Sequence, residues 1–498
     1  MGNWIVLPVV LPATMAPLIV LAARHDIVLA RVFSLFATAA LVPLAIALWV
    51  AAGSGPEVYL LGNWPAPFGI VLVLDRLAAL MLMLTSLLAL AVAVYAAGGF
   101  DTRGRHFHAL FQFQLMGVNG AFLTGDVFNL FVFFEVLLIA SYGLMLHGTQ
   151  GRGLISGFQY IAVNLIGSTL FLFAVGLIYG VTGTLNMADL IAKVPLVPEA
   201  DQALLRVGAL LLMMVFAIKA ALVPLHFWLP GTYTAAGAPV AALFAIMTKV
   251  GAYSLLRVHG MAFAGLTGAW LVPAALVTAV LGMVGVLGAR RLRDQACFAL
   301  IGSMGTLLVA IGLGSPAGIA AALYYLVSST LAAAMLFLVV DLAATRRGET
   351  GDLAEPAPAA PGQDLIAGLF FLAAILMVGM PPLSGFLGKL LVLDAASGDP
   401  RANWIWAVVL GTSLIALVGF ARTGSAVFWK CAALPPRSEA PPLRAAAVAA
   451  IGGLLLLAVL QTVLAGPAMR AFESIAAEVH DPAGYVSTVL GPRQEAAR

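Results

Sequence analysis

Apolar runs of about 20 residues, long enough for a helix to span the hydrocarbon core of a bilayer, recur along the chain from Trp4 almost to Pro467. Short polar breaks separate them. The pattern therefore predicts an all-α polytopic membrane protein with about fourteen transmembrane helices. We place these at residues 4–22, 31–52, 77–98, 107–124, 127–147, 155–180, 205–230, 238–260, 264–288, 295–314, 317–342, 365–392, 403–428 and 444–466.

Two of the predicted helices are interrupted by proline. Pro224 follows Lys219 by just over one turn in the seventh, and Pro381 and Pro382 precede Lys389 in the twelfth. A proline inside a helix removes a backbone hydrogen bond and clashes with the preceding turn. Paired discontinuous helices are typical of transporters built from inverted repeats, and these two lie five helices apart. We predict two inverted five-helix repeats, each with a broken helix, and divide the chain into N-terminal helices (1–106), a first repeat (107–260), a second repeat (264–430) and a last helix with a C-terminal tail (431–498).

The composition agrees with a membrane protein and excludes several other functions. Hydrophobic residues make up 62% of the 498 residues, charged residues 9%, and the mean hydropathy is +1.05. Cys297 and Cys431 form no metal-binding or redox motif, so no cofactor is expected. The net charge of +3 is spread over several loops, which gives no nucleic-acid-binding face. Gly312–Ala317 matches a loose GxGxxA pattern, but it connects two membrane helices, and no phosphate loop or hydrolase motif is present.

Lysine and arginine are distributed unevenly between alternate loops, which predicts the orientation of the chain. The richer side has thirteen: Arg24, Arg31, Arg103, Arg105, Arg152, Arg290, Arg291, Arg293, Arg346, Arg347, Lys430, Arg437 and Arg444. The other side has Arg76, Lys193, Arg206, Arg257 and Arg401. We therefore expect an even number of helices with both termini outside the cytoplasm. On that outer side, the β-prone run Ile70–Leu74 leads to Asp75 at the start of the third helix.

Four ionisable residues lie within the apolar runs: Glu135, Lys219, Lys249 and Lys389. Such residues are costly at bilayer depth and mark ion or proton pathways. Burial favours the neutral form of each group, whereas a partner's charge favours the ionised form, so a Glu135–Lys219 pair has two charge states of similar energy. Lysine can lose its proton and arginine essentially cannot, which suits a relay. The alternatives are a static ion pair that holds helices together and lysines that snorkel to the interface.

Polar side chains along the same helices are candidates to support a proton path. His226 lies in the first broken helix, where it can transfer protons or cap the frayed backbone. Tyr253 follows Lys249 by one turn on the same helical face. Others occupy the sixth and eleventh helices: Gln159, Asn164, Ser168, Tyr324, Ser328, Ser329 and Thr330. Each could equally join helices by hydrogen bonds.

The broken helices carry a recognisable motif. The spacing Lys219-x-x-x-x-Pro224-x-His226-x-Trp228, followed by Lys249-x-Gly251-x-Tyr253, resembles the antiporter-like proton-channel module of respiratory complex I and of Mrp-type cation/proton antiporters. The segment from Gly379 to Lys389 resembles the second broken helix of that module. Within the superfamily, the segment from Gly117 to Glu135 is most similar to the MrpD family, one of the membrane subunits of Mrp-type multisubunit Na⁺/H⁺ antiporters.

The resemblance implies a role for each membrane-depth residue. Glu135 and Lys219 correspond to a coupled pair, Lys249 to the central relay and Lys389 to the terminal relay. The chain has Ser328 and Ser329 where relatives often carry histidine, so the link between the last two lysines would depend on hydroxyl groups or water. Oxygen ligands suit Na⁺, and its candidate ligands, chosen by chemistry alone, are Asp126, Thr124 and Asn129.

These observations predict a proton-translocating subunit of a monovalent cation/H⁺ antiporter in the bacterial cytoplasmic membrane, a secondary transporter rather than an enzyme. The resemblance also implies partner membrane subunits in a hetero-oligomer. The alternative is a pumping, non-redox subunit of a complex I-like NADH:quinone oxidoreductase or a membrane hydrogenase. A third hypothesis is a scaffold that conducts nothing, although a scaffold has no evident need for three lysines at membrane depth.

Overall fold

The computed structural model describes residues 4–148, 151–267, 270–433 and 440–491, and almost all of them are helical. Every predicted span coincides with one or two helices. Their bounds are α1 Leu7–Ala22, α2 Ile27–Ala52, α3 Arg76–Ala97, α4 Phe107–Leu123, α5 Val127–Met145, α6 Arg152–Thr182, α7 Met187–Lys193, α8 Glu199–Lys219, α9 Trp228–Ala235, α10 Ala238–Ser254, α11 Ala264–Thr267, α12 Leu271–Gly288, α13 Leu292–Gly312, α14 Pro316–Ala344, α15 Gln363–Val378, α16 Ser384–Ala395, α17 Ala402–Gly424, α18 Ala445–Val463, α19 Ala465–His480 and α20 Ala483–Leu490. Within the described ranges, 11 helices are long and apolar enough to cross a membrane, so the membrane protein is confirmed and the count of fourteen crossings stays a prediction.

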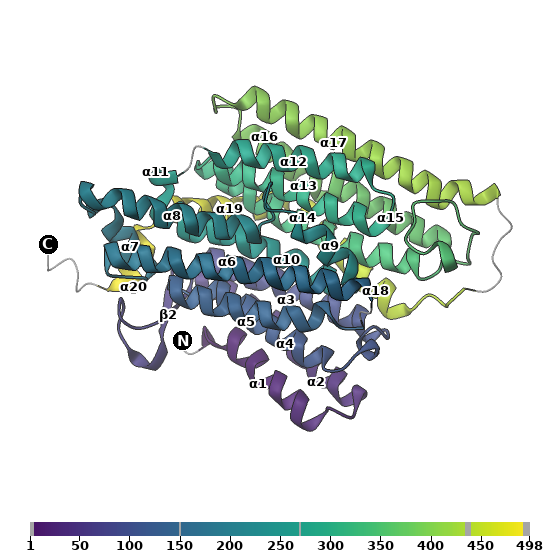
Figure 1. Cartoon of the computed structure of the whole chain (residues 1–498), viewed down its shortest axis with the longest axis horizontal. Helices are drawn as coiled ribbons and strands as arrows, with labels where there is room; N and C mark the ends of the chain where they lie inside the picture. Colours follow the sequence, from purple (N-terminus) through teal and green to yellow (C-terminus); the bar gives the residue numbers. More distant parts are fainter. Residues whose placement is uncertain (1–3, 149–150, 268–269, 434–439, 492–498) are drawn as a thin grey trace.

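The long helices run side by side along the length of the molecule, with α1 and α2 at one edge and α17 at the other (Figure 1). Burial divides them into a centre and a rim. The apolar window of α10 and its continuation is 100% buried and that of α14 94%, whereas those of α2, α17 and α18 are 33% buried. The rim helices therefore present apolar side chains outward, as lipid-facing helices do.

A short hairpin precedes α3. Strand β1 (Glu57–Leu60) pairs antiparallel with β2 (Val71–Leu74), and Glu57 lies opposite Leu74. The predicted β-prone run is thus confirmed. Asp75 caps α3, since its side chain accepts a hydrogen bond of 2.9 Å from the backbone N–H of Ala78.

Both predicted helix breaks are present. The first separates α8 from α9, and there the indole of Trp228 donates to the carbonyl of Ile218 at 3.0 Å. The backbone N–H of Val223 donates to Thr278 Oγ1 of α12, also at 3.0 Å. The second break separates α15 from α16, with Gly379 in the left-handed region at φ 79°. Side chains from neighbouring helices thus satisfy backbone groups that the breaks release, as a membrane interior requires.

Two features at the end of the bundle where α3 begins could not be predicted from the sequence. A π-helical segment (Leu255–Phe263) continues α10, and Arg257, near the end of the predicted span 238–260, is 3% exposed. In the predicted C-terminal tail, α19 buries Phe472 and Ile475, and the ring of Phe472 packs against Tyr324 of α14. Contacts between segments far apart in the sequence decide both features.

Candidate functional site

Glu135 lies in the middle of α5 and is half-buried. Its carboxylate accepts a hydrogen bond from Ser168 Oγ of α6. Apolar rings surround this contact, since Phe134 and Phe171 meet edge to face with ring centres 5.7 Å apart. The hydroxyl of Ser168 therefore partly replaces the water that the carboxylate loses.

Lys219 is the last residue of α8, and the first helix break follows it directly. Its buried Nζ donates to Asn164 Oδ1 of α6 at 2.6 Å and lies 5.9 Å from the ring centre of Phe134. Asn164 in turn donates to the carbonyl of Tyr160 at 2.8 Å. The amide thus holds the lysine with a partner that carries no charge of its own.

The carboxylate and the ammonium are joined through α6. Among the described residues, no ion pair connects Glu135 directly to Lys219; each binds its own residue on that helix instead. Asn164 and Ser168 are four residues apart and therefore share one helical face. A cavity of about 10 Å³ adjoins this arrangement, close to the smallest volume that holds one water molecule. It is lined by Phe134, Leu137, Tyr160, Asn164, Lys219, Trp228, Met247 and Val250.

Lys249 lies at the centre of the molecule, in the fully buried helix α10. It is 0% exposed, and its Nζ has no hydrogen-bond partner among the described residues. Two residues later, Gly251 packs on the end of α8 so closely that a Cβ atom there would lie 3.0 Å from the carbonyl carbon of Lys219. The two lysines thus belong to helices in direct contact, and a charge on Lys249 would be uncompensated.

Lys389 lies in α16, just after the second break. Its Nζ donates to the carbonyl of Val378 at 2.7 Å and to Ser413 Oγ of α17 at 2.8 Å. The neighbouring Gly388 packs on α14, where a Cβ atom would lie 3.3 Å from Ser328 Oγ. Sequence reasoning missed Ser413, although a polar Thr412–Ser413 pair in an otherwise apolar helix could have indicated it.

The residues predicted to support the proton path differ in their burial and hydrogen bonds. Ser328 and Ser329 are buried and donate to carbonyls of their own helix at 3.1 and 3.3 Å. His226 lies half-buried in the first break. The hydroxyl of Tyr253 donates to the carbonyl of Phe122 at 2.6 Å and accepts from Arg257. Tyr253 therefore contacts the ion pair between Arg257 and Asp75.

The three candidate cation ligands lie together at the start of α5. Asp126 caps that helix by accepting from the backbone N–H of Asn129 at 2.8 Å, and Asn129 Nδ2 donates to Thr124 Oγ1 at 2.9 Å. Burial raises the pKa of Asp126, while backbone N–H groups of Asn129 and Phe128 act against the rise. Within the described part of the chain, no group of three or more His, Cys, Asp or Glu could hold a metal ion. The arrangement explains a helix cap, and cation binding there stays a prediction.

Comparisons with known proteins show which family the whole chain is similar to. Residues 124–417 match the family model described as NADH:quinone oxidoreductase/Mrp antiporter, TM. A protein of Rhizobium meliloti (strain 1021), named as a probable K(+)/H(+) antiporter subunit of type D, is 39% identical, over 98% of each chain. The Na(+)/H(+) antiporter subunit of the same type from Bacillus subtilis (strain 168) is 36% identical, over 86% of this chain and 87% of the relative. A chain of the Mrp complex from Dietzia sp. DQ12-45-1b superimposes with a TM-score of 0.87 at 28% identity, covering 99% of this chain and 100% of that one.

Proposed function

Because this chain belongs to the NADH:quinone oxidoreductase/Mrp antiporter family, we propose that it is a subunit of a monovalent cation/H⁺ antiporter and moves protons through its membrane-depth glutamate and lysines. The observation that carries the proposal is a pair of contacts on one face of α6: Ser168 binds Glu135, and Asn164, one turn away, binds Lys219. The two contacts bring an acid and a base to the same polar helix face. A purely structural ion pair would need no intervening amide and hydroxyl.

In the proposed mechanism, the four ionisable residues take different parts. Glu135 and Lys219 form the coupled pair, Lys249 is the central relay, and Lys389 is the terminal relay, with Ser328 and Ser329 beside α16. A proton on Lys249 repels the charge on Lys219 and so weakens its attraction to Glu135. Protonation thereby shifts the population between two states of the pair, which couples proton transfer to cation movement.

The alternative function is proton pumping in a complex I-like oxidoreductase or a membrane hydrogenase. The family description covers both classes, and the shared fold does not separate them. Likeness to proteins named as antiporter subunits, at 36 and 39% identity over most of the chain, favours the antiporter. The cation, whether Na⁺ or K⁺, is not distinguished by these names.

The setting of the protein follows from the same family. We propose that it works with other membrane subunits in the bacterial cytoplasmic membrane and that its two inverted repeats comprise residues 107–260 and 264–430. Both termini are proposed to lie outside the cytoplasm. The start of α1 and the last described helix, α20, lie toward the same end of the bundle (left in Figure 1), which supports an even number of crossings.

The test is cation-induced dissipation of a respiration-generated pH gradient in everted vesicles that contain this chain with its neighbouring subunits. Na⁺ or K⁺ should collapse the gradient, and Glu135→Gln should lower the rate at least about fivefold, the lower end of typical coupling between two sites. Glu473→Gln, on the exposed face of α19, is the matched control. A parent complex that responds to no monovalent cation would favour the redox alternative instead.

A second variant separates a relay from a static charge. Lys249→Arg keeps the positive charge but holds a proton too tightly to release it. If Lys249 relays protons, the variant should transport as poorly as Lys249→Met. Both variants should be compared at equal amounts of assembled complex, and parental activity in Lys249→Arg would rule out the relay.

A further inference from the structure

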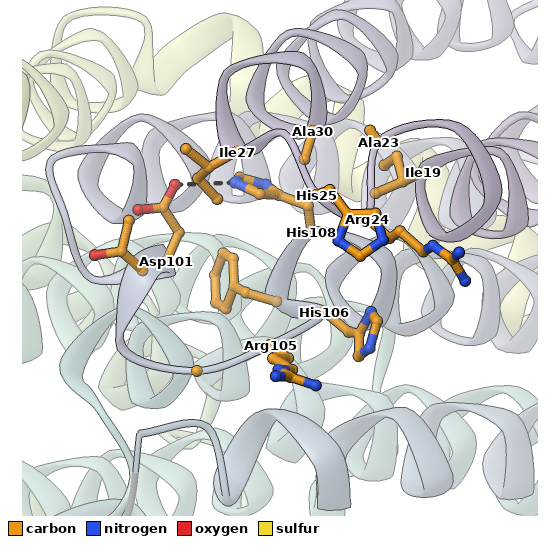
Figure 2. Close-up of a pocket in the computed structure, with 13 residues that line it drawn as sticks. Ile19, Ala23, Arg24, His25, Ile27, Ala30, Asp101, Arg105, His106 and His108 are labelled. Atoms are coloured by element: carbon orange, nitrogen blue, oxygen red, sulfur yellow. Dashed lines mark hydrogen bonds and ion pairs between the residues drawn. The ribbon is translucent and has the colours of Figure 1, made fainter.

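A pocket of about 510 Å³ opens between the α1–α2 turn and the loop that precedes α4, at the rim of the bundle (Figure 2). It lies away from the row of lysines described above. Its size is within the usual range for small-molecule sites. It is lined by Ile19, Ala23, Arg24, His25, Ile27, Ala30, Asp101, Thr102, Gly104, Arg105, His106, Phe107 and His108.

The rim of the pocket is basic and uncompensated. Arg24 and His25 come from the turn above the opening in Figure 2, and Arg105 and His106 from the loop below it. All four are exposed. Among the described residues, neither arginine takes part in an ion pair, so both charges are available to a ligand.

The single acidic residue that lines the pocket is already neutralised. Asp101 accepts hydrogen bonds of 2.6 and 2.8 Å from the guanidinium of Arg31, and its Oδ2 lies 3.0 Å from His108 Nε2. Burial alone would raise the pKa of Asp101, but the hydrogen bonds from Arg31 and His108 outweigh it and hold that pKa well below its usual range. The pocket therefore has a net positive charge.

His108 offers a polar atom that the protein leaves unused. The side chain is 2% exposed, and its Nδ1 has no hydrogen-bond partner among the described residues, whereas Nε2 faces Asp101. Buried polar atoms are nearly always satisfied, so an unpaired one in the wall of a pocket points to a ligand. In the charged ring, Nδ1 is a donor and suits an anionic oxygen.

One wall of the pocket is apolar and continues along the helices. Ile19, Ala23, Ile27 and Ala30 form this wall. Beyond it, three residues of the same two helices are strongly exposed: Leu18 at 44%, Leu21 at 81% and Val28 at 62%. A polar pocket thus leads directly to an apolar track on the outside of α1 and α2.

We propose that this pocket binds the phosphate headgroup of an anionic phospholipid, whose acyl chains lie along the outer faces of α1 and α2. The arginines supply the charge, His108 the buried hydrogen bond, and the exposed apolar side chains the track. The basic loops predict that this end faces the cytoplasm, where anionic lipids attract basic residues next to the membrane. An acidic segment of a partner protein would use the arginines but would leave the apolar track unexplained.

The experiment titrates the purified full-length chain in nonionic detergent with phosphatidylglycerol or phosphatidylcholine and counts bound lipid by native mass spectrometry. The test variant is Arg24→Gln/Arg105→Gln. The control is Arg290→Gln/Lys430→Gln, which removes two exposed charges elsewhere on the predicted cytoplasmic side. Arg24→Lys/Arg105→Lys keeps the charge and monitors folding.

The parent should prefer phosphatidylglycerol, and the Gln variant should bind it about 10- to 30-fold more weakly, since each basic residue beside an anionic surface contributes roughly fivefold. The Lys variant and the control should stay within about threefold of the parent. Inorganic phosphate at millimolar concentration should not displace the lipid. The proposal is overturned if the Gln variant binds phosphatidylglycerol like the parent, or if phosphate competes as a free anion.

Discussion

The hydrogen bonds of Asn164 give Lys219 a neutral partner, so the lysine does not pair directly with Glu135. The side-chain carbonyl oxygen of Asn164 accepts from Lys219, and its NH₂ group donates to the carbonyl of Tyr160. One helical turn later, Ser168 binds Glu135. In an apolar interior, such contacts compensate the desolvation of each charge without locking the two into one ion pair.

Asn164→Leu should therefore impair transport without unfolding the protein. The variant removes the acceptor of a charged hydrogen bond, which is worth about 1.5–3 kcal/mol, and leaves Lys219 unsatisfied. Cation-induced dissipation of the pH gradient should fall at least about tenfold, the rate equivalent of about 1.4 kcal/mol. Thr169→Val is the control, because Thr169 is exposed on the same helix and bonds only its own backbone. Equal losses in both variants would show that α6 tolerates no change and would refute a specific role.

The two broken helices are satisfied by different means. At the first break, the indole of Trp228 takes the released carbonyl of Ile218, so Lys219 remains free to bind Asn164. At the second break, Lys389 itself takes the carbonyl of Val378. Lys389 therefore satisfies a backbone carbonyl at the break and also lies in the proposed proton path.

Close backbone contact holds the second break in shape, which gives a test at this scale. A Cβ atom at Gly385 would lie 1.9 Å from the carbonyl oxygen of Leu376, whereas one at Gly368 of α15 meets nothing within 4 Å. Gly385→Ala should lose about 1–3 kcal/mol of stability, as overpacked sites do. Gly368→Ala should keep or gain about 0.5–1 kcal/mol. The stability of both variants is measured by thermal unfolding of the purified chain, with size-exclusion chromatography as the readout. A Gly385→Ala variant as stable as the parent would contradict the close contact.

At the end of the bundle where α3 begins, a buried ion pair joins segments far apart in the sequence. Arg257 donates to both oxygens of Asp75 at 2.5 and 2.6 Å. The guanidinium also lies over the rings of Tyr253 and Tyr485, which ties α20 to α10. The start of α3, the extension of α10 and the C-terminal helix thus meet around one charge pair.

Breaking this pair from one side should destabilise the protein strongly. Asp75→Asn or Arg257→Met leaves one buried charge without its partner, at a cost of about 3–5 kcal/mol. The double variant Asp75→Asn/Arg257→Met should recover part of that loss, because no unpaired charge remains. A double-mutant cycle on thermal unfolding measures the coupling. Additive losses would mean that the two side chains do not depend on each other.

The sequence alone determined the membrane fold, the two breaks and the membrane-depth residues. Apolar runs long enough to span a bilayer can hardly be anything but transmembrane helices. A proline inside such a run can break the helix, as at Pro224 and at Pro381 and Pro382, although α2 continues through Pro43. Glu135, Lys219, Lys249 and Lys389 were recognisable because charge is rare in such runs. The matching family and relatives confirm the predicted kind of protein, whereas the roles of these residues stay predictions.

Only the tertiary structure decided which of these residues touch. The sequence does not show that Asn164 and Ser168 stand between Glu135 and Lys219, that Ser413 binds Lys389, or that Arg257 is buried against Asp75. Hydropathy reports whether a residue prefers lipid or water, but a hydrogen-bond partner depends on how separate helices pack and rotate against one another. The basic pocket has the same origin, because two separate turns form it only when α1, α2 and α4 come together.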